Sequence, residues 1–131
     1  MGISSHFSND DLARAWITRF SSDRRRVLTA GAADEQLKAD QQIEADTIWA
    51  FDALEDLISR DFDRAWAIVL RILDLAGEDE NVLDNLAAGP LETLLARNGR
   101  TVVEWVEDEA RRNPKFKNLL TGSASESVYK A

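Results

Sequence analysis

The stretch from Asp61 to Gly77, DFDRAWAIVLRILDLAG, constrains the fold more than any other part of the chain. Asp61 is a good helix N-cap, and Gly77 suits the left-handed position that follows a helix. Between them large apolar side chains spread around most of the helix circumference, and only a narrow polar strip interrupts them: Asp63, Arg64, Arg71 and Asp74. A helix that is apolar nearly all round is usually buried. The sequence therefore predicts a central helix at about 61–76.

Helical periodicity recurs on both sides of this segment. Ser8 and Asp11 have the spacing of a capping box, which predicts a helix from about Asn9 to Phe20 or Ser21. Other apolar stripes predict further helices, over about 44–59, 80–88, 90–98 and 101–113. The whole pattern predicts an all-α fold, a single compact bundle of five or six helices around the central one. This domain would span residues 1–122, with a loose tail at 123–131.

Two places interrupt the periodic pattern. Residues 22–42 contain only Val27, Leu28 and Leu37 as large apolar side chains. They predict a long, partly ordered connection that can include a helical stretch from Asp34 onward. Such a connection is functional, mobile or a misread helix. At the second place Gly89 precedes a proline, and a residue before proline is disfavoured in helical angles. The sequence therefore predicts a break between two helices at Gly89.

The charge is unevenly distributed along the chain. The net charge is −8, but residues 34–96 hold sixteen acids against four bases, a local net charge of −12. This acidic middle argues against nucleic-acid binding over most of the surface and permits a basic protein partner. The alternative is that acidic helices only keep a small protein in solution. The one basic run is Arg24-Arg25-Arg26. It could bind a phosphate or an acidic partner, pair with the acidic residues of 34–96, or stay solvated.

Several function classes lack the residues that they need. The chain has no cysteine and a single histidine, His6. Disulfides, thiolate metal sites, cysteine nucleophiles and sites with several imidazole ligands are therefore not expected. No Ser-His-Asp set and no glycine-rich phosphate loop are present, so neither a catalytic triad nor a cofactor is predicted. No apolar run reaches the roughly 20 residues of a membrane span, and no secretory signal begins the chain, so we expect a cytoplasmic protein without membrane contact.

Carboxylates are the remaining candidates for chemistry. Two clusters occur, one in each of two predicted helices: Asp52, Glu55 and Asp56, and Glu104, Glu107 and Asp108. Such groups can bind magnesium or act as acid and base. Both clusters fall on faces turned away from the apolar stripe of their helix. The simpler interpretation is therefore a solvated acidic face.

The four tryptophans divide into two pairs. Trp16 and Trp66 lie within apolar stripes and are predicted in the core. Trp49 lies roughly opposite the stripe of the 44–59 helix, and Trp105 lies at the edge of its own stripe. Because tryptophan is enriched at interface hot spots, a tryptophan away from the core face and among acids is a candidate partner anchor. The alternative is that Trp49 packs beneath the 22–42 connection.

Two stretches, NLAAGPLETLLARNG and EDEARRNPKFKNLL, resemble a group of small, uncharacterised bacterial all-helical proteins. In that group a similar Gly-Pro corner is followed by a Glu-Ala-Arg-Arg-Asn-Pro-x-Phe sequence. The resemblance covers about residues 85–122. It implies a helical fold, and it carries no known activity and no functional residues.

Together these features favour a non-catalytic interaction protein, for instance a small inhibitor or an immunity-type protein. It would present an acidic helical face to a basic partner. The predicted partner-binding residues are Trp49, Asp52, Glu55, Asp56 and Trp105. Two alternatives stay open at this point, a carboxylate-dependent hydrolase with a magnesium site and a subunit that assembles with copies of itself.

Overall fold

A computed structural model describes residues 7–29, 31 and 33–121 of the chain, and its elements are all helical. They follow in the order α1 (Asn9–Phe20), α2 (Ser22–Thr29), α3 (Asp34–Arg60), α4 (Phe62–Ala76), α5 (Glu80–Leu86), the π-helical turn η2 (Ala87–Leu91), α6 (Glu92–Arg112) and α7 (Pro114–Thr121). The prediction of an all-α fold is confirmed. The predicted tail at 123–131 lies outside the described residues. Within the described part, no helix is both long enough and apolar enough to cross a membrane.

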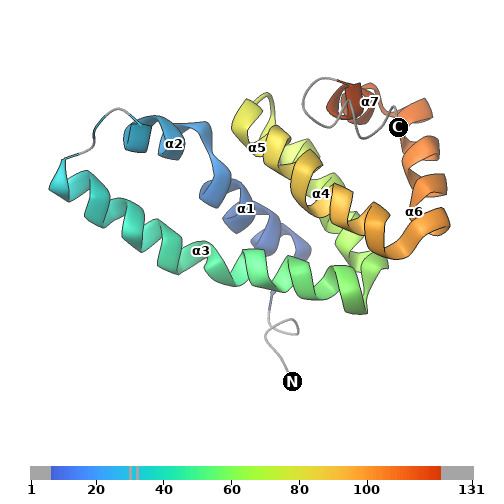
Figure 1. Ribbon diagram of the computed structural model, residues 1–131, viewed down its shortest axis with the longest axis horizontal. Helices are drawn as coiled ribbons and strands as arrows, with labels where there is room; N and C mark the ends of the chain where they lie inside the picture. The colour runs from blue at the N-terminus through green and yellow to red at the C-terminus, as the bar shows by residue number, and fades with distance from the viewer. Residues whose placement is uncertain (1–6, 30, 32, 122–131) are drawn as a thin grey trace.

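The core centres on α1, the second half of α3, and α4, which pack against one another. Trp16 of α1 is only 1 % exposed. Helix α4 also contacts α5 and α6, which agrees with its predicted central place. Along the molecule, α2 and the start of α3 lie at one end, and α6 and α7 lie at the opposite end (Figure 1). The buried residues of α4 face its neighbours at helical spacing: Ala65, Ile68, Val69, Ile72 and Leu73.

The boundaries of α4 are those that its end residues predict. The Asp61 side chain caps the helix by accepting a hydrogen bond from the Arg64 backbone N–H at 3.3 Å. Gly77 follows the helix with a φ of +63°, a conformation that side chains with a Cβ rarely adopt. The predicted capping box of α1, between Ser8 and Asp11, is also present.

The polar strip of α4 is only partly solvated. Arg64 donates from Nε to the Asn9 side-chain oxygen at 2.9 Å, and Arg71 pairs from Nε with the Asp10 carboxylate at 2.7 Å. Both arginines thus reach the first turn of α1. These contacts fix the start of α1 against α4, while Asp63 and Asp74 remain exposed.

The expected long connection over residues 22–42 is mostly helical, and the helical stretch expected from Asp34 onward is present. Residues 22–29 form α2, and α3 begins at Asp34 rather than at Glu44. Periodicity missed this because most side chains of α3 between 34 and 46 are exposed and polar. Ion pairs from arginines of α1 and α2 support this half of α3 instead of an apolar stripe.

The predicted helix break at Gly89 is wrong. The chain continues from α5 through η2 into α6, and Pro90 lies inside this π-helical turn. A proline in a regular α-helix lacks the N–H for the hydrogen bond and clashes with the carbonyl four residues earlier, whereas a wider π turn relieves that clash. The Gly89 carbonyl accepts the Thr93 hydroxyl at 2.9 Å. The predicted helix end at Asn98-Gly99 does correspond to a kink, since Gly99 has φ +54° and ψ −128° inside α6.

Candidate protein-interaction face on helix α3

Four of the five predicted partner-binding residues lie on α3, within two turns of one another. Asp52 and Asp56 are exposed, whereas Trp49 and Glu55 are half-buried. Asp56 forms an ion pair with Arg60 one turn later, at 3.4 Å. The side chains of Asp52 and Glu55 form no hydrogen bond or ion pair with any other described residue. The helix therefore presents two uncompensated carboxylates beside an aromatic ring.

Trp49 is held in place by the segment that precedes α1. Its ring centroid lies 5.2 Å from that of Phe7. Phe7 in turn lies under the Arg64 guanidinium, 4.7 Å from the ring centroid, and its carbonyl accepts a hydrogen bond from Arg64 at 2.9 Å. Trp49 thus packs against Phe7. Because the ring is only half-buried, part of its surface stays open to solvent.

Trp105 belongs to a different part of the molecule. Its ring stacks on Phe62 of α4 with centroids 5.4 Å apart, and it lies 5.7 Å from Trp66. Trp66 also meets Phe116 of α7 edge-on at 5.7 Å. Trp66, predicted in the core, is half-buried at the border of this cluster, whereas Phe116 is fully buried. A partner contact at the half-exposed Trp105 stays a prediction, separate from the α3 face.

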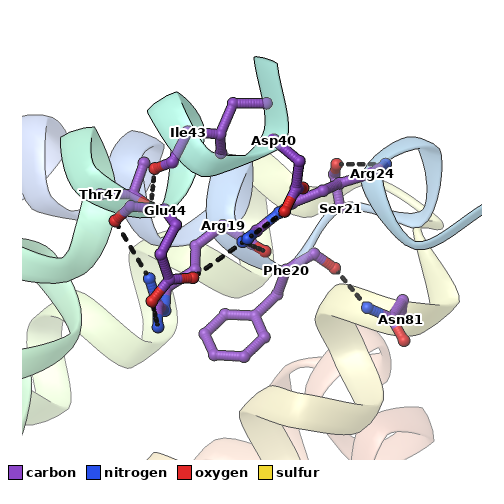
Figure 2. A network of polar contacts seen from close by, with 9 residues as sticks. All are labelled: Arg19, Phe20, Ser21, Arg24, Asp40, Ile43, Glu44, Thr47 and Asn81. Carbon is purple, nitrogen blue, oxygen red and sulfur yellow. Dashed lines mark hydrogen bonds and ion pairs between the residues drawn. The ribbon is translucent and has the colours of Figure 1, made fainter. Parts of the chain in front are cut away.

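The structure reveals an ion-pair network at the other end of α3, which we call the brace: Arg19, Arg24, Asp40 and Glu44 (Figure 2). Arg24 pairs with both Asp40 oxygens, through Nε and through Nη2 at 3.0 Å, and it reaches Glu44 at 3.0 Å. Arg19 pairs with the other Glu44 oxygen at 2.8 Å. The third arginine nitrogen, Nη1 of Arg24, donates to the Arg19 carbonyl at 2.9 Å. The brace therefore joins α1, α2 and α3.

The brace also sets the ionisation of its carboxyls. The hydrogen bond from Arg24 lowers the pKa of Asp40, and those from Arg19 and Arg24 lower the pKa of Glu44. In return, the hydrogen bond to Asp40 raises the pKa of Arg24. These shifts favour the charged forms of Asp40, Glu44 and Arg24. The arginine side chains are largely covered, so these pairs are better shielded from solvent than ordinary surface pairs.

A second polar contact holds the start of α2. Asp79 caps α5 and accepts the Ser22 backbone N–H at 3.0 Å and the Ser22 hydroxyl at 2.5 Å. Burial raises the pKa of Asp79, but the hydrogen bonds from Ser22, Val82 and Asn81 outweigh burial, and the pKa lies below its usual value. The Asn81 amide also donates to the Phe20 carbonyl at 2.7 Å (Figure 2). The junction of α1 and α2 is thus tied to α5.

The brace accounts for one arginine of the basic run Arg24-Arg25-Arg26. Arg24 pairs with the acidic middle of the chain, as one of the three interpretations proposed, and Arg26 pairs locally with exposed Asp23. The Arg25 side chain lies outside the described part. The sequence signal that would have found the brace is the pair Asp40 and Glu44, which lie one turn apart and on the same side of a helix.

The magnesium alternative depends on where the carboxylates lie relative to one another. Among the residues that the structure describes, no group of three or more His, Asp or Glu side chains is placed to hold a metal ion. Glu109 is the one buried carboxylate there, and it accepts from Arg112 at 2.9 Å and from the Asn113 amide at 2.9 Å. Its oxygens are therefore occupied in fixing the end of α6.

A family model described as a family of unknown function (DUF6869) matches residues 36–129. The matched segment begins on the exposed half of α3 and includes Trp49, Asp52, Glu55 and Asp56, as well as Trp105. No curated protein and no solved structure matches the chain.

Proposed function

We propose that this chain, which belongs to a family of unknown function (DUF6869), is a non-catalytic protein-interaction module. Its α3 face docks a basic protein, as a small inhibitor or immunity-type protein would. The observation that carries the proposal is the exposed Asp52, which pairs with none of the described residues, beside Glu55 and the half-buried Trp49. We place the protein in the bacterial cytoplasm, in line with the absence of cysteine and the bacterial resemblance of residues 85–122.

The α3 carboxylates and the Trp49 ring are expected to act at different stages of binding. Exposed carboxylates attract a basic surface over a distance and so speed the encounter, and salt screens this attraction. A half-buried tryptophan makes close contacts only after docking, and therefore slows dissociation. Packing against Phe7 fixes the Trp49 ring in advance, which reduces the entropy that binding would cost.

The test is affinity capture from the source cell, followed by binding kinetics with the captured protein. The double substitution Asp52→Lys and Glu55→Lys is expected to slow association at least about tenfold and to flatten its salt dependence. Trp49→Ala is expected to speed dissociation and to cost about 2 kcal/mol of binding free energy.

The matched control is Glu104→Lys with Glu107→Lys, which reverses two exposed acids on α6 instead of α3. It should leave both rates within about a factor of two. The proposal is abandoned if the captured protein binds the α3 double variant as fast as the unaltered chain, or if the α6 control slows association equally.

A further inference from the structure

The first half of α3 is a helix without a buried face. Residues 34–46, which we call the arm, are exposed except for the half-buried Asp40 and Ile43. Helices in proteins owe most of their stability to the packing of an apolar face, and short unpacked helices are marginal in water. Here the brace holds the arm in place through Asp40 and Glu44. The chain thus keeps this helix ordered while leaving most of its surface open.

Two of the three exposed large apolar side chains in the described part of the chain lie on α3. Leu37 is 40 % exposed and Ile48 is 36 % exposed. They are close to three helical turns apart, so they lie on the same face of the helix, about 16 Å from each other. Between them the same face carries Gln41 and Glu44. This face is therefore a polar stripe with one apolar residue near each end.

The charge around this stripe indicates what can cover it. Helix α3 carries eight carboxylates and only two cations, Lys38 and Arg60. The brace compensates Asp40 and Glu44, and Arg60 compensates Asp56. Asp52 and Glu55 continue the stripe beyond Ile48 and remain unpaired among the described residues. A second copy of this face would bring like charges together, which disfavours self-association through it.

From this placement we infer that the partner contributes a basic amphipathic helix that lies along α3. Two apolar side chains of that helix cover Leu37 and Ile48, and its lysines and arginines meet the acids that flank them. Helices recognise one another through apolar residues at regular turns, with flanking charges that set orientation. The inference rests on the proposed function and extends it from a basic partner to a basic helix, and from Trp49 to the arm.

The probe is a synthetic peptide of about 18 residues, long enough for about five helical turns, with lysines on one face and leucines on the other. Its controls are a scrambled peptide of the same composition, in which the leucines are spread around the helix, and a peptide with glutamate in place of lysine. Binding is followed by fluorescence anisotropy, and helix formation in the peptide by circular dichroism. The amphipathic peptide is expected to bind at least about tenfold more tightly than the scrambled one, and the glutamate peptide is expected not to bind.

The decisive variant of the protein is Leu37→Ser with Ile48→Ser. It should weaken binding of the amphipathic peptide about tenfold or more, which corresponds to 1.4 kcal/mol or more. The matched control is Val103→Ser on α6, which removes an apolar side chain that is 41 % exposed and should change affinity less than about twofold. Both substitutions are at the surface, and urea unfolding checks that each variant is folded.

The outcomes separate this inference from the proposed function. If the amphipathic and scrambled peptides bind equally, and Asp52→Lys with Glu55→Lys weakens both while Leu37→Ser with Ile48→Ser weakens neither, the helix inference is overturned and acidic docking stands. If the charge reversal has no effect either, both are overturned. A concentration-dependent dimer that the Leu37→Ser and Ile48→Ser variant abolishes would assign the stripe to a second copy and overturn the inference.

Discussion

The two halves of α3 belong to one continuous helix, yet they are held by different forces. From residue 47 onward the helix buries a full apolar stripe against α1 and α4: Ala50, Leu54, Leu57 and Ile58. The arm, residues 34–46, buries no side chain completely. The brace, through Arg19 and Arg24, attaches the arm to α1 and α2. A single element therefore passes from apolar packing to ion pairing along its length.

This contrast has consequences for stability. Apolar burial depends on area and is insensitive to salt and to the ionisation of carboxyls. An ion-pair network depends on geometry and charge, and it weakens when salt screens it or acid neutralises it. The second half of α3 should therefore unfold only with the whole bundle, whereas the arm should open on its own. Variants in the two regions can test this difference.

The largest effect is expected at Trp16, in the apolar region. Trp16 is 1 % exposed and packs against Phe20 in a tilted arrangement with ring centroids 4.3 Å apart. Trp16→Ala should lower the free energy of unfolding by about 3–5 kcal/mol, as large aromatic truncations in cores do. Urea unfolding measures this loss, and Trp66→Ala is the matched comparison. Because Trp66 is half-buried, Trp66→Ala should lower the free energy of unfolding clearly less than Trp16→Ala does. An equal or greater loss would show that the core is centred nearer α6 and α7.

A smaller and more local effect is expected at Arg24, in the brace. Arg24→Ala leaves Asp40 without its partner and should lower the local opening free energy of the arm by about 1–2 kcal/mol. Global unfolding should change by no more than about 0.5 kcal/mol. Amide hydrogen exchange distinguishes local opening of the arm from global unfolding. Exchange should become faster in the arm and stay unchanged in α4.

Arg24→Lys separates charge from geometry at the same position. A lysine keeps the positive charge but cannot hold Asp40 through two nitrogens at once, so it should restore only part of the protection. If Arg24→Ala speeds exchange in α4 as much as in the arm, the two regions are one cooperative unit, and the contrast between them fails.

The smallest effect is expected from acid. The pKa values of Asp40 and Glu44 are lowered by their arginine partners, so the brace contributes fully above the ordinary carboxyl pKa of about 4. That contribution is lost as the pH falls through the lowered values in the folded protein. Carbon NMR of the side-chain carboxyls should show both pKa values rising toward the ordinary range in Arg24→Ala, more completely for Asp40 because Glu44 keeps Arg19.

Asp10 serves as the internal reference in the same spectra. Its pKa is lowered by the hydrogen bond from Arg71, which lies outside the brace. It should not respond to Arg24→Ala. A shift of Asp10 together with Asp40 would mean that the substitution disturbs the bundle as a whole.

The sequence predicted best where local signals and burial agree. The helix at 61–76 was found with its two ends because Asp61, Gly77 and the apolar residues between them all favour the same element. The sequence proposed Trp49 and its neighbouring acids for the candidate face because they lie off the apolar stripe of the 44–59 helix. The start of α3 was expected only as a stretch within the 22–42 connection, and Leu37 was not assigned to the candidate face, since a polar segment gives no periodic signal.

What the sequence by itself determined is the all-helical class, the start of α1, the central helix and the acidic character of α3. These depend on caps, periodicity and composition, which are properties of neighbouring residues. Only the tertiary structure decided that residues 22–42 are mostly helical, that the chain passes Pro90 in a π turn, and that Arg24 meets Asp40. Each of these depends on residues that are distant in sequence or on the packing of Pro90 and Leu91 into the core. Such contacts outweigh weak local preferences. A buried side chain or a paired arginine stabilises the fold by more free energy than the helix propensities of a few residues cost.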